Sequence, residues 1–224
     1  PHGRPEPAPA SDPAAEDVYL TTRTSTTSPF GALGAVAPVN SPTAADIHPT
    51  LTEDGKVMIL STRASDTGTL SPSFHLRRYL DTGGGFLANP GYAVATDASS
   101  AEIQPYLVSN TQTLYYAAIK PTTGGRHVLF RAIRTSDAYP TPVELTALNG
   151  TANEAQFPVA TADDSVVYFS SNRPAGGGGG FDIWRAAGTG GGVFTSIVAL
   201  PGLSSPALDW PTWISPDTCR LYLI

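Results

Sequence analysis

The sequence has little cysteine, methionine or lysine. Its 224 residues include one cysteine, one methionine and only two lysines, Lys56 and Lys120. Because Cys219 is the only thiol, no disulfide can form within the chain, and no cysteine pair is available for a metal or redox centre. A single cysteine in the apolar run at 219–224 is typical of a small buried hydrophobic residue.

Charge and long apolar runs are also scarce. Charged residues make up 14% of the chain and its net charge is −6. Nucleic acid is therefore a poor partner, because phosphate binding needs a concentrated basic face and none is visible. The longest apolar stretches span a few residues, so no transmembrane helix is predicted, and no secretory signal peptide is visible.

Sequence motifs of the common catalytic sites are missing. The chain has no Gly-x-Ser-x-Gly elbow, no His-Glu-x-x-His, no phosphate-binding Gly-x-x-x-x-Gly-Lys and no EF-hand loop. The glycine run at 176–180 has no neighbouring lysine and precedes an apolar segment, which indicates a hairpin loop. His75 and His127 begin equivalent segments and are interpreted as structural. We therefore expect a non-enzyme without a cofactor.

Glycine and proline, by contrast, are abundant, with 22 and 21 residues between short apolar runs. Four segments share an acid, a proline, a short strand, a turn residue and an apolar strand. They cover 46–60, 102–116, 154–169 and 209–224, and their prolines are Pro49, Pro105, Pro158 and Pro211. Each proline is expected at the first residue of its strand, where a missing N–H is tolerated.

Two further strands fall between successive segments. The third strand is predicted at 17–23, 74–79, 127–131 and 181–185, and a weaker fourth strand at 34–39, 92–96, 143–148 and 194–200. Four short strands per repeat are typical of a propeller blade. The sequence thus predicts an all-β protein, a β-propeller of four-stranded antiparallel blades with about four blades. Residues 1–16 are expected to form a linker or long loop, and residues 17–224 a single domain.

The clearest repeat carries the motifs Ser171-Asn172-Arg173, a glycine run and Asp182-Ile183-Trp184, and the next carries Pro-Thr-Trp-Ile-Ser-Pro-Asp at 211–217. This pattern resembles the TolB-type, WD-like propeller repeat. TolB-type domains engage lipoproteins of the peptidoglycan-associated class. The resemblance therefore implies a non-catalytic protein-binding or scaffold module of the bacterial envelope, periplasmic or extracellular. Asn110-Thr111 and Phe74-His75-Leu76 depart from the pattern.

The repeats leave a half unit at each end of the chain. Either the halves combine into one blade, or the chain is a segment of a larger propeller. The first alternative predicts that Leu221–Ile224 lies next to Asp17–Thr22. Trp213 occupies the repeat position of Leu51, Leu107 and Ala160 and is expected to be buried between blades.

The candidate binding site is the mouth of the central channel, which the first strand of each blade lines. The acids before each proline should occupy equivalent positions there, forming a ring of carboxylates. The residues proposed for this site are Asp46, Glu102, Glu154 and Asp209, with His48, Gln104, Phe157 and Trp210 immediately before the prolines.

Two roles are open for the acids. They could join neighbouring blades by hydrogen bonds to arginine or backbone N–H groups, which we favour, or bind a cation or a basic extended peptide. Two other functions remain. A carbohydrate-active propeller enzyme, a glycosidase or lyase, would need paired carboxylates over a cleft, and the acid ring is its only candidate. A structural subunit of a larger assembly would fit the half units.

Overall fold

The computed structural model describes residues 16–36, 39–41, 44–64, 70–89, 91–94, 100–108, 112–174 and 180–224, with the backbone alone at 70–72. Residues 1–15, the predicted turn at Asn110-Thr111 and most of the glycine run lie outside this part. The strands are β1 (Tyr19–Leu20), β2 (Gly34–Ala35), β3 (Asp46–Leu51), β4 (Val57–Ala64), β5 (Leu70–Asp81), β6 (Phe86–Ala88), β7 (Ala101–Val108), β8 (Thr113–Ile119), β9 (His127–Ile133), β10 (Val143–Glu144), β11 (Ala155–Ala160), β12 (Val166–Ser171), β13 (Asp182–Gly190), β14 (Val193–Ala199), β15 (Pro211–Ile214) and β16 (Leu221–Leu223). The helical elements are short: η1 (Pro121–Thr123), α1 (Thr146–Asn149) and η2 (Pro201–Leu203).

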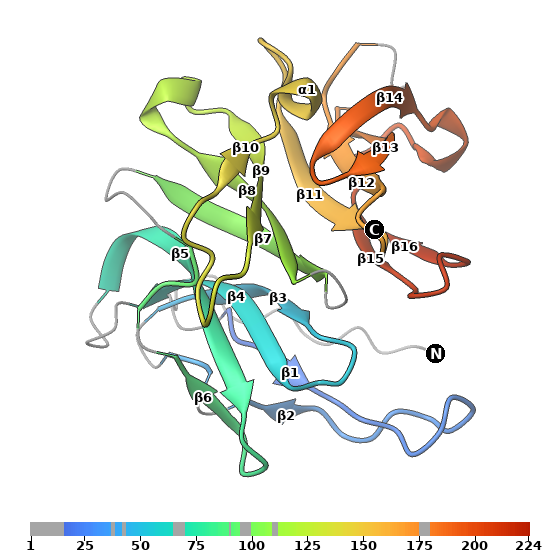
Figure 1. The fold of residues 1–224 in the computed structure, drawn as a ribbon. Coiled ribbons are helices and arrows are strands. Elements are labelled where there is room, and N and C mark those ends of the chain that lie inside the picture. The colour runs from blue at the N-terminus through green and yellow to red at the C-terminus, as the bar shows by residue number, and fades with distance from the viewer. Residues whose placement is uncertain are drawn as a thin grey trace.

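The described strands form three four-stranded antiparallel sheets, β3–β6, β7–β10 and β11–β14, and two two-stranded sheets, β1–β2 and β15–β16. The sheets follow one another around a common centre, from blue to red in Figure 1. The first strands β3, β7, β11 and β15 each contact the next one in this series. The predicted all-β propeller, with the first strand of each blade innermost, is therefore confirmed.

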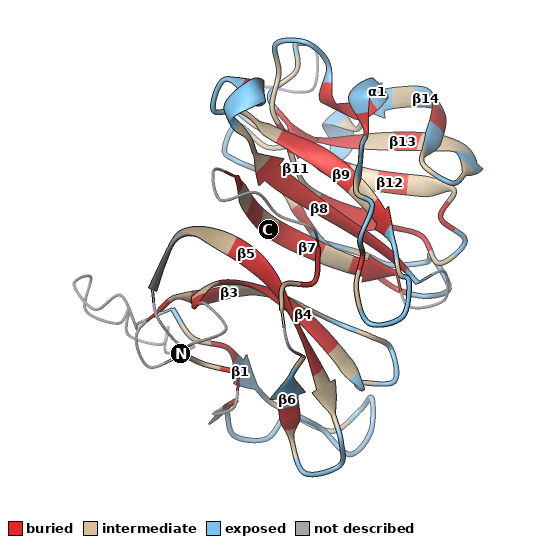
Figure 2. Cartoon of the chain, turned by 60° about the vertical axis from the view of Figure 1, so that its left-hand side comes forward, coloured by how far each residue is buried: buried red, intermediate tan, exposed pale blue. Residues whose placement is uncertain are grey.

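Apolar clusters between successive sheets form the core. Adjacent residues of a strand point to opposite faces, so Tyr115 packs toward β11–β14 with Phe169, whereas Tyr116 packs toward β3–β6 with Ile59. Figure 2 shows buried residues along β7, β8, β9 and β11, while β1 and many loops are exposed. The central strands thus hold the molecule together through contacts between sheets.

The motif Ser171-Asn172-Arg173 has a structural role. The hydroxyl of Ser171 donates to the Glu154 carbonyl at 2.6 Å, and the Asn172 side-chain oxygen accepts from the Glu154 N–H at 2.7 Å. The Arg173 guanidinium lies over the ring of Trp184, 5.5 Å from its centre. The first two contacts fix the start of β11 against the end of β12, and the third joins the end of β12 to β13.

The predicted pairing of Leu221–Ile224 with Asp17–Thr22 is wrong. β16 pairs with β15, and β1 pairs with β2. The β1–β2 segment instead places Val18 and Val36 against Met58 and Leu60 of β4, so these two valines are buried on the β3–β6 sheet while Tyr19 and Leu20 are exposed.

Two predicted fourth strands are also placed differently. The fourth strand of the β3–β6 sheet is Phe86–Ala88 and not 92–96, because a glycine-rich turn at 83–85 reverses the chain directly after β5. Val94 forms a single bridge to Tyr139, and residues 95 and 96 are not described. In the next sheet the predicted strand 143–148 stops at Glu144 and continues as α1.

Trp213 and Cys219 are exposed, contrary to prediction. Trp213 is 43% exposed, and its counterpart Leu51 is 40% exposed, whereas Leu107 is 6% and Ala160 1% exposed. Leu107 and Ala160 lie on first strands that have a neighbouring first strand on both sides. Leu51 and Trp213 lie on the first and last of the four, so the same repeat position is buried only in the middle of the series.

Candidate binding site

The prolines of the repeat do not begin their strands, except in the last unit. Pro49, Pro105 and Pro158 lie inside β3, β7 and β11, and only Pro211 begins a strand. In the three earlier units the proline and the residue before it form a β-bulge, with an extra residue on the first strand. A bulge accommodates proline because it interrupts the hydrogen bonds between the strands.

The residue before each of these three prolines has a left-handed backbone. His48, Gln104 and Phe157 have φ angles of 52°, 54° and 51°. This conformation costs about 1–3 kcal/mol for a residue other than glycine, and such strain is concentrated at functional sites. Its recurrence in three units makes this end of the first strands a candidate site.

The strained residues surround one cavity of about 270 Å³, which we call the pre-proline cavity. All four first strands contribute to it. Its walls are the four prolines and the residues before them, His48, Gln104, Phe157 and Trp210. The structure thus brings together the four pre-proline residues that the sequence proposed for the channel mouth. The described lining contains no Asp, Glu, Lys or Arg side chain.

Aromatic contacts connect three of these units. Phe157 stacks on Trp210 with ring centres 5.0 Å apart and planes 14° apart, and His48 meets Phe157 edge-on at 5.7 Å. The Gln104 amide fills the remaining side, accepting from the Phe157 N–H at 3.1 Å and donating to Gln156 at 3.2 Å. The wall is therefore mostly apolar and held from several strands.

Burial shifts the pKa of two side chains in the lining of this cavity, His48 and Tyr106, whose pKa rises to about 12. Burial lowers the pKa of the His48 imidazole, so the ring is uncharged at neutral pH. Its Nδ1 atom is buried and has no hydrogen-bond partner among the described residues. The described lining consequently has no charged side chain and one ring nitrogen without a hydrogen-bond partner among the described residues.

The two glutamates of the proposed ring join neighbouring sheets through histidine rather than arginine. His75 on β5 donates from Nδ1 to Glu102 on β7 at 2.8 Å, and His127 on β9 donates to Glu154, just before β11, at 2.6 Å. Glu102 also accepts from the Ser100 hydroxyl at 2.6 Å. The same contact thus connects two successive pairs of sheets.

The two aspartates accept backbone N–H groups. Ser41 donates to Asp46 at 2.5 Å, and Ser205 donates to Asp209 at 2.6 Å. Burial raises the pKa of Asp46, although hydrogen bonds from Thr62 and Ser41 oppose this shift. None of the four acids lines the pre-proline cavity.

The sequence predicted that the four acids occupy equivalent positions, and this prediction is wrong. Asp46 pairs with Thr62 on the second strand of its sheet, and Glu102 pairs with Ala118 on the second strand of the next sheet. In the third sheet the residue at this position, the second pair before the bulge, is Ala155. Glu154 lies one residue earlier, and Asp209 lies one residue nearer its proline. Among the described residues, no group of three or more His, Cys, Asp or Glu side chains is arranged to hold a metal ion.

Sequence reasoning missed a second cavity, at the opposite end of the first strands. Its lining includes Tyr106, which also lines the pre-proline cavity. Tyr106 directly follows the repeat proline Pro105, and this spacing could have placed it on the channel. In the described part of the chain no helix is long and apolar enough to cross a membrane.

Comparison with protein-family descriptions gives no match, and neither does comparison with curated proteins. Among solved structures, the chain is similar to one assigned as TolB from Agrobacterium tumefaciens, at 13% identity and a TM-score of 0.50, over 92% of this chain and 69% of that one. TolB from Acinetobacter baumannii matches at 12% identity and a TM-score of 0.46, over 84% of this chain and 42% of that one. A periplasmic gluconolactonase from Pseudomonas aeruginosa matches at 13% identity and a TM-score of 0.48, over 86% of this chain and 54% of that one.

These similarities concern the fold. A fold alone does not decide between binding and catalysis. The repeat motifs and the arrangement of the sheets agree, and this chain has the fold of a TolB-type β-propeller.

Proposed function

We propose that this chain is a non-catalytic protein-interaction propeller of the bacterial envelope. Its pre-proline cavity receives an uncharged apolar or aromatic side chain from a segment of a partner protein. The observation that carries the proposal is the convergence of four pre-proline residues, three of them with strained backbones, on one uncharged cavity.

The chemistry of the wall supports an apolar ligand. Stacked Phe157 and Trp210, together with four prolines, offer flat apolar surfaces, while Gln104 and His48 supply the few polar atoms. Binding sites commonly combine an apolar lining with a few polar groups that orient the ligand. A basic peptide is less suitable than the sequence suggested, because the nearby acids already accept hydrogen bonds within the protein.

The cavity size supports a side chain as the ligand. Pockets for small molecules have volumes of about 300–1,000 Å³, and the pre-proline cavity, at about 270 Å³, is just below that range. One or two side chains of an extended segment fill such a space, with the rest of the segment lying across the mouth.

The proposed location outside the cytoplasm rests on the TolB-type repeat and on the similarity to a TolB fold. A glycosidase or lyase needs two carboxylates about 5–10 Å apart over a cleft. The described lining of the pre-proline cavity contains no Asp or Glu side chain, which favours binding over this chemistry.

Calorimetric titration with the pentapeptides acetyl-Ala-Ala-Xaa-Ala-Ala-amide tests the proposal. We expect binding when Xaa is Trp or Leu, at an affinity that salt barely changes, because the described lining has no charged side chain. Phe157→Ala should weaken this binding roughly tenfold, the usual cost of truncating an aromatic contact residue. The exposed Phe30, which lies outside the cavity, provides the matched control Phe30→Ala.

Tighter binding of the Lys or Glu peptide, or an unchanged affinity in Phe157→Ala, would contradict the proposal. Circular dichroism of both variants shows whether each still folds.

A further inference from the structure

The cavity at the other end of the first strands, which we call the turn-end cavity, has a volume of about 280 Å³. It is formed by the ends of β3, β7, β11 and β15 and by the turns that follow β3, β11 and β15. Tyr106 lines both cavities. It therefore lies where the two cavities meet.

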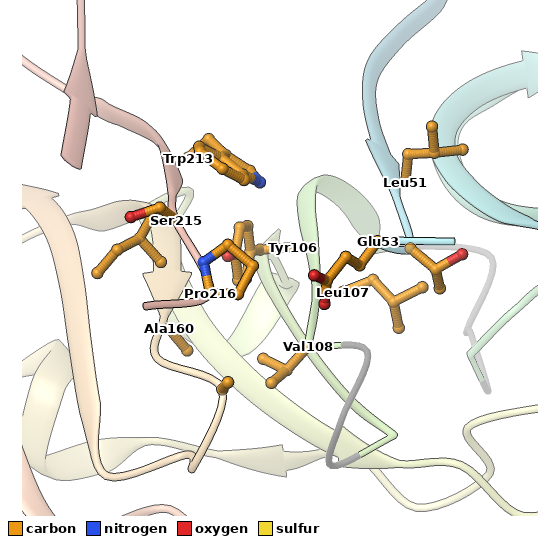
Figure 3. A pocket seen from close by; sticks show the side chains of 12 residues that line it. Leu51, Glu53, Tyr106, Leu107, Val108, Ala160, Trp213, Ser215 and Pro216 are labelled. Carbon is orange, nitrogen blue, oxygen red and sulfur yellow. The ribbon is translucent and has the colours of Figure 1, made fainter. Parts of the chain in front are cut away.

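The turn-end cavity combines apolar and aromatic walls with one acid. Leu51 and Leu107 provide apolar surface, and Trp213 provides an aromatic ring that is 43% exposed. Tyr222 packs against Trp213 with ring centres 5.4 Å apart. Figure 3 shows the carboxylate of Glu53 pointing from the β3–β4 turn toward the side chains of Tyr106 and Pro216.

The charge of Glu53 is not compensated within the described structure. Lys56, the cation of the same turn, pairs instead with Asp81 at 3.3 Å. Asp54, the other acid of the turn, accepts from the Thr52 hydroxyl at 2.6 Å and from the Lys56 N–H at 3.0 Å. Glu53 has no ion pair or side-chain hydrogen bond with any described residue. The carboxylate of Glu53 is therefore a negative charge without a described partner at the edge of the turn-end cavity.

We propose that the turn-end cavity binds an organic cation, an ammonium group carried on an apolar chain. The face of an indole ring attracts ammonium groups, most strongly when water is partly excluded. Glu53 supplies the opposite charge, and the leucine side chains contact the carbon chain of the ligand. Two sources share this chemistry: a lysine side chain of a protein, and a small quaternary ammonium compound.

This inference does not rest on the function proposed above, because apart from Tyr106 the two cavities share no lining residue. Failure of one site leaves the other standing. Phe157→Ala tests only the pre-proline cavity, and variants of Glu53 and Trp213 test only the turn-end cavity.

The test is a titration followed by the indole N–H resonance of Trp213 in ¹H–¹⁵N NMR spectra. The probes are N-acetyl-lysine methylamide, its neutral analogue N-acetyl-norleucine methylamide, and choline. Trp213→Phe assigns the resonance. We expect the lysine derivative to shift it, with an affinity that falls as salt is added, and the norleucine derivative to bind more weakly.

Glu53→Gln should reduce the affinity for the lysine derivative roughly two- to fivefold, the range for an exposed ion pair. Trp213→Leu, which keeps an apolar wall, should reduce it by a similar factor through loss of the cation–π contact; this loss is followed by backbone amide shifts. Glu16→Gln, an exposed acid that lines neither cavity, is the control for net charge and should change nothing.

Binding of choline but not of the lysine derivative supports the site and identifies a free ammonium compound as the source, whereas the reverse identifies a protein lysine. Equal binding of the lysine and norleucine derivatives, unchanged binding in Glu53→Gln, or no shift of Trp213 with either cation would overturn the proposal.

Discussion

The two ends of the same four first strands differ in the charge of the side chains that line their cavities. At the pre-proline end the residue before the proline has a left-handed backbone in three units, the four acids accept hydrogen bonds within the protein, and the described cavity lining has no charged side chain. At the turn end, short hairpin turns carry exposed acids, and Glu53 is left without a partner. One repeat thus produces an end suited to recognise shape and an end suited to recognise charge.

The turns at the turn end share one hydrogen bond between a hydroxyl and an aspartate. In three units a hydroxyl donates to the aspartate two residues later, and this bond is the largest cause that lowers the pKa of each aspartate. The pairs are Thr52–Asp54 at 2.6 Å, Thr161–Asp163 at 2.6 Å and Ser215–Asp217 at 2.5 Å. The charge of these three aspartates stabilises the turns, whereas burial at the pre-proline end disfavours the charged form of Asp46.

The largest predicted effect concerns the hydrogen bonds between sheets at the pre-proline end. Glu102→Ala leaves the buried His75 without its partner and should lower the free energy of unfolding by about 3–5 kcal/mol. Glu53→Ala, the same change at the turn end, should alter it by about 0.5 kcal/mol or less. Urea denaturation measures both, and similar costs for the two variants would contradict the contrast.

A second comparison uses one repeat position in two units. Leu107→Ala removes a buried side chain and should cost about 2–5 kcal/mol. Leu51→Ala removes its 40%-exposed counterpart and should cost about 0.5 kcal/mol. Thermal and urea unfolding of both variants check this, and an equal loss would show that Leu51 is as well packed as Leu107.

The third prediction concerns pH. Because burial lowers the pKa of His48, the unfolded chain binds a proton more readily than the folded protein. The contribution of His48 to stability is therefore present above its unfolded pKa of about 6.5 and decreases as the pH falls below that value. His48→Gln should show a smaller loss of stability between pH 7 and 5 than the unmodified protein. Identical slopes for the two proteins would be the contrary result.

The smallest predicted effect is at the turns. The pKa of Asp54 is lowered in the folded protein, so its stabilising contribution is present above about pH 4 and is lost as the pH falls through the folded value. Asp54→Asn should therefore be slightly less stable than the unmodified protein at pH 6 and equal to it at pH 2. Glu53→Gln, which removes a charge from the same turn but no hydrogen bond, is the control. An equal loss at both pH values would show that the charge of Asp54 is irrelevant.

The sequence predicted the features that depend on local pattern. The repeated acid, proline, turn residue and apolar run located the first and second strands, and the proline spacing placed Phe157 and Trp210 at the channel mouth. The bulges were not predicted, because a proline is compatible both with the first residue of a strand and with a bulge inside it. The contacts of Glu102 could not be predicted, because its partner His75 lies 27 residues away on another sheet. The exposure of Trp213 likewise could not be predicted, because it depends on which sheets lie beside its strand and not on its own segment.

The three tryptophans allow both ends to be observed in one experiment. Trp210 lines the pre-proline cavity, Trp213 lines the turn-end cavity, and Trp184 is buried in the core as an internal reference. Acetyl-Ala-Ala-Leu-Ala-Ala-amide and N-acetyl-lysine methylamide are titrated separately while the three indole N–H resonances are recorded. We predict that the leucine peptide shifts Trp210 and not Trp213, and that the lysine derivative shifts Trp213 and not Trp210. Shifts of the same indole by both probes, or no shift of Trp210 by the leucine peptide, would contradict the assignment of an uncharged binding site to the pre-proline end.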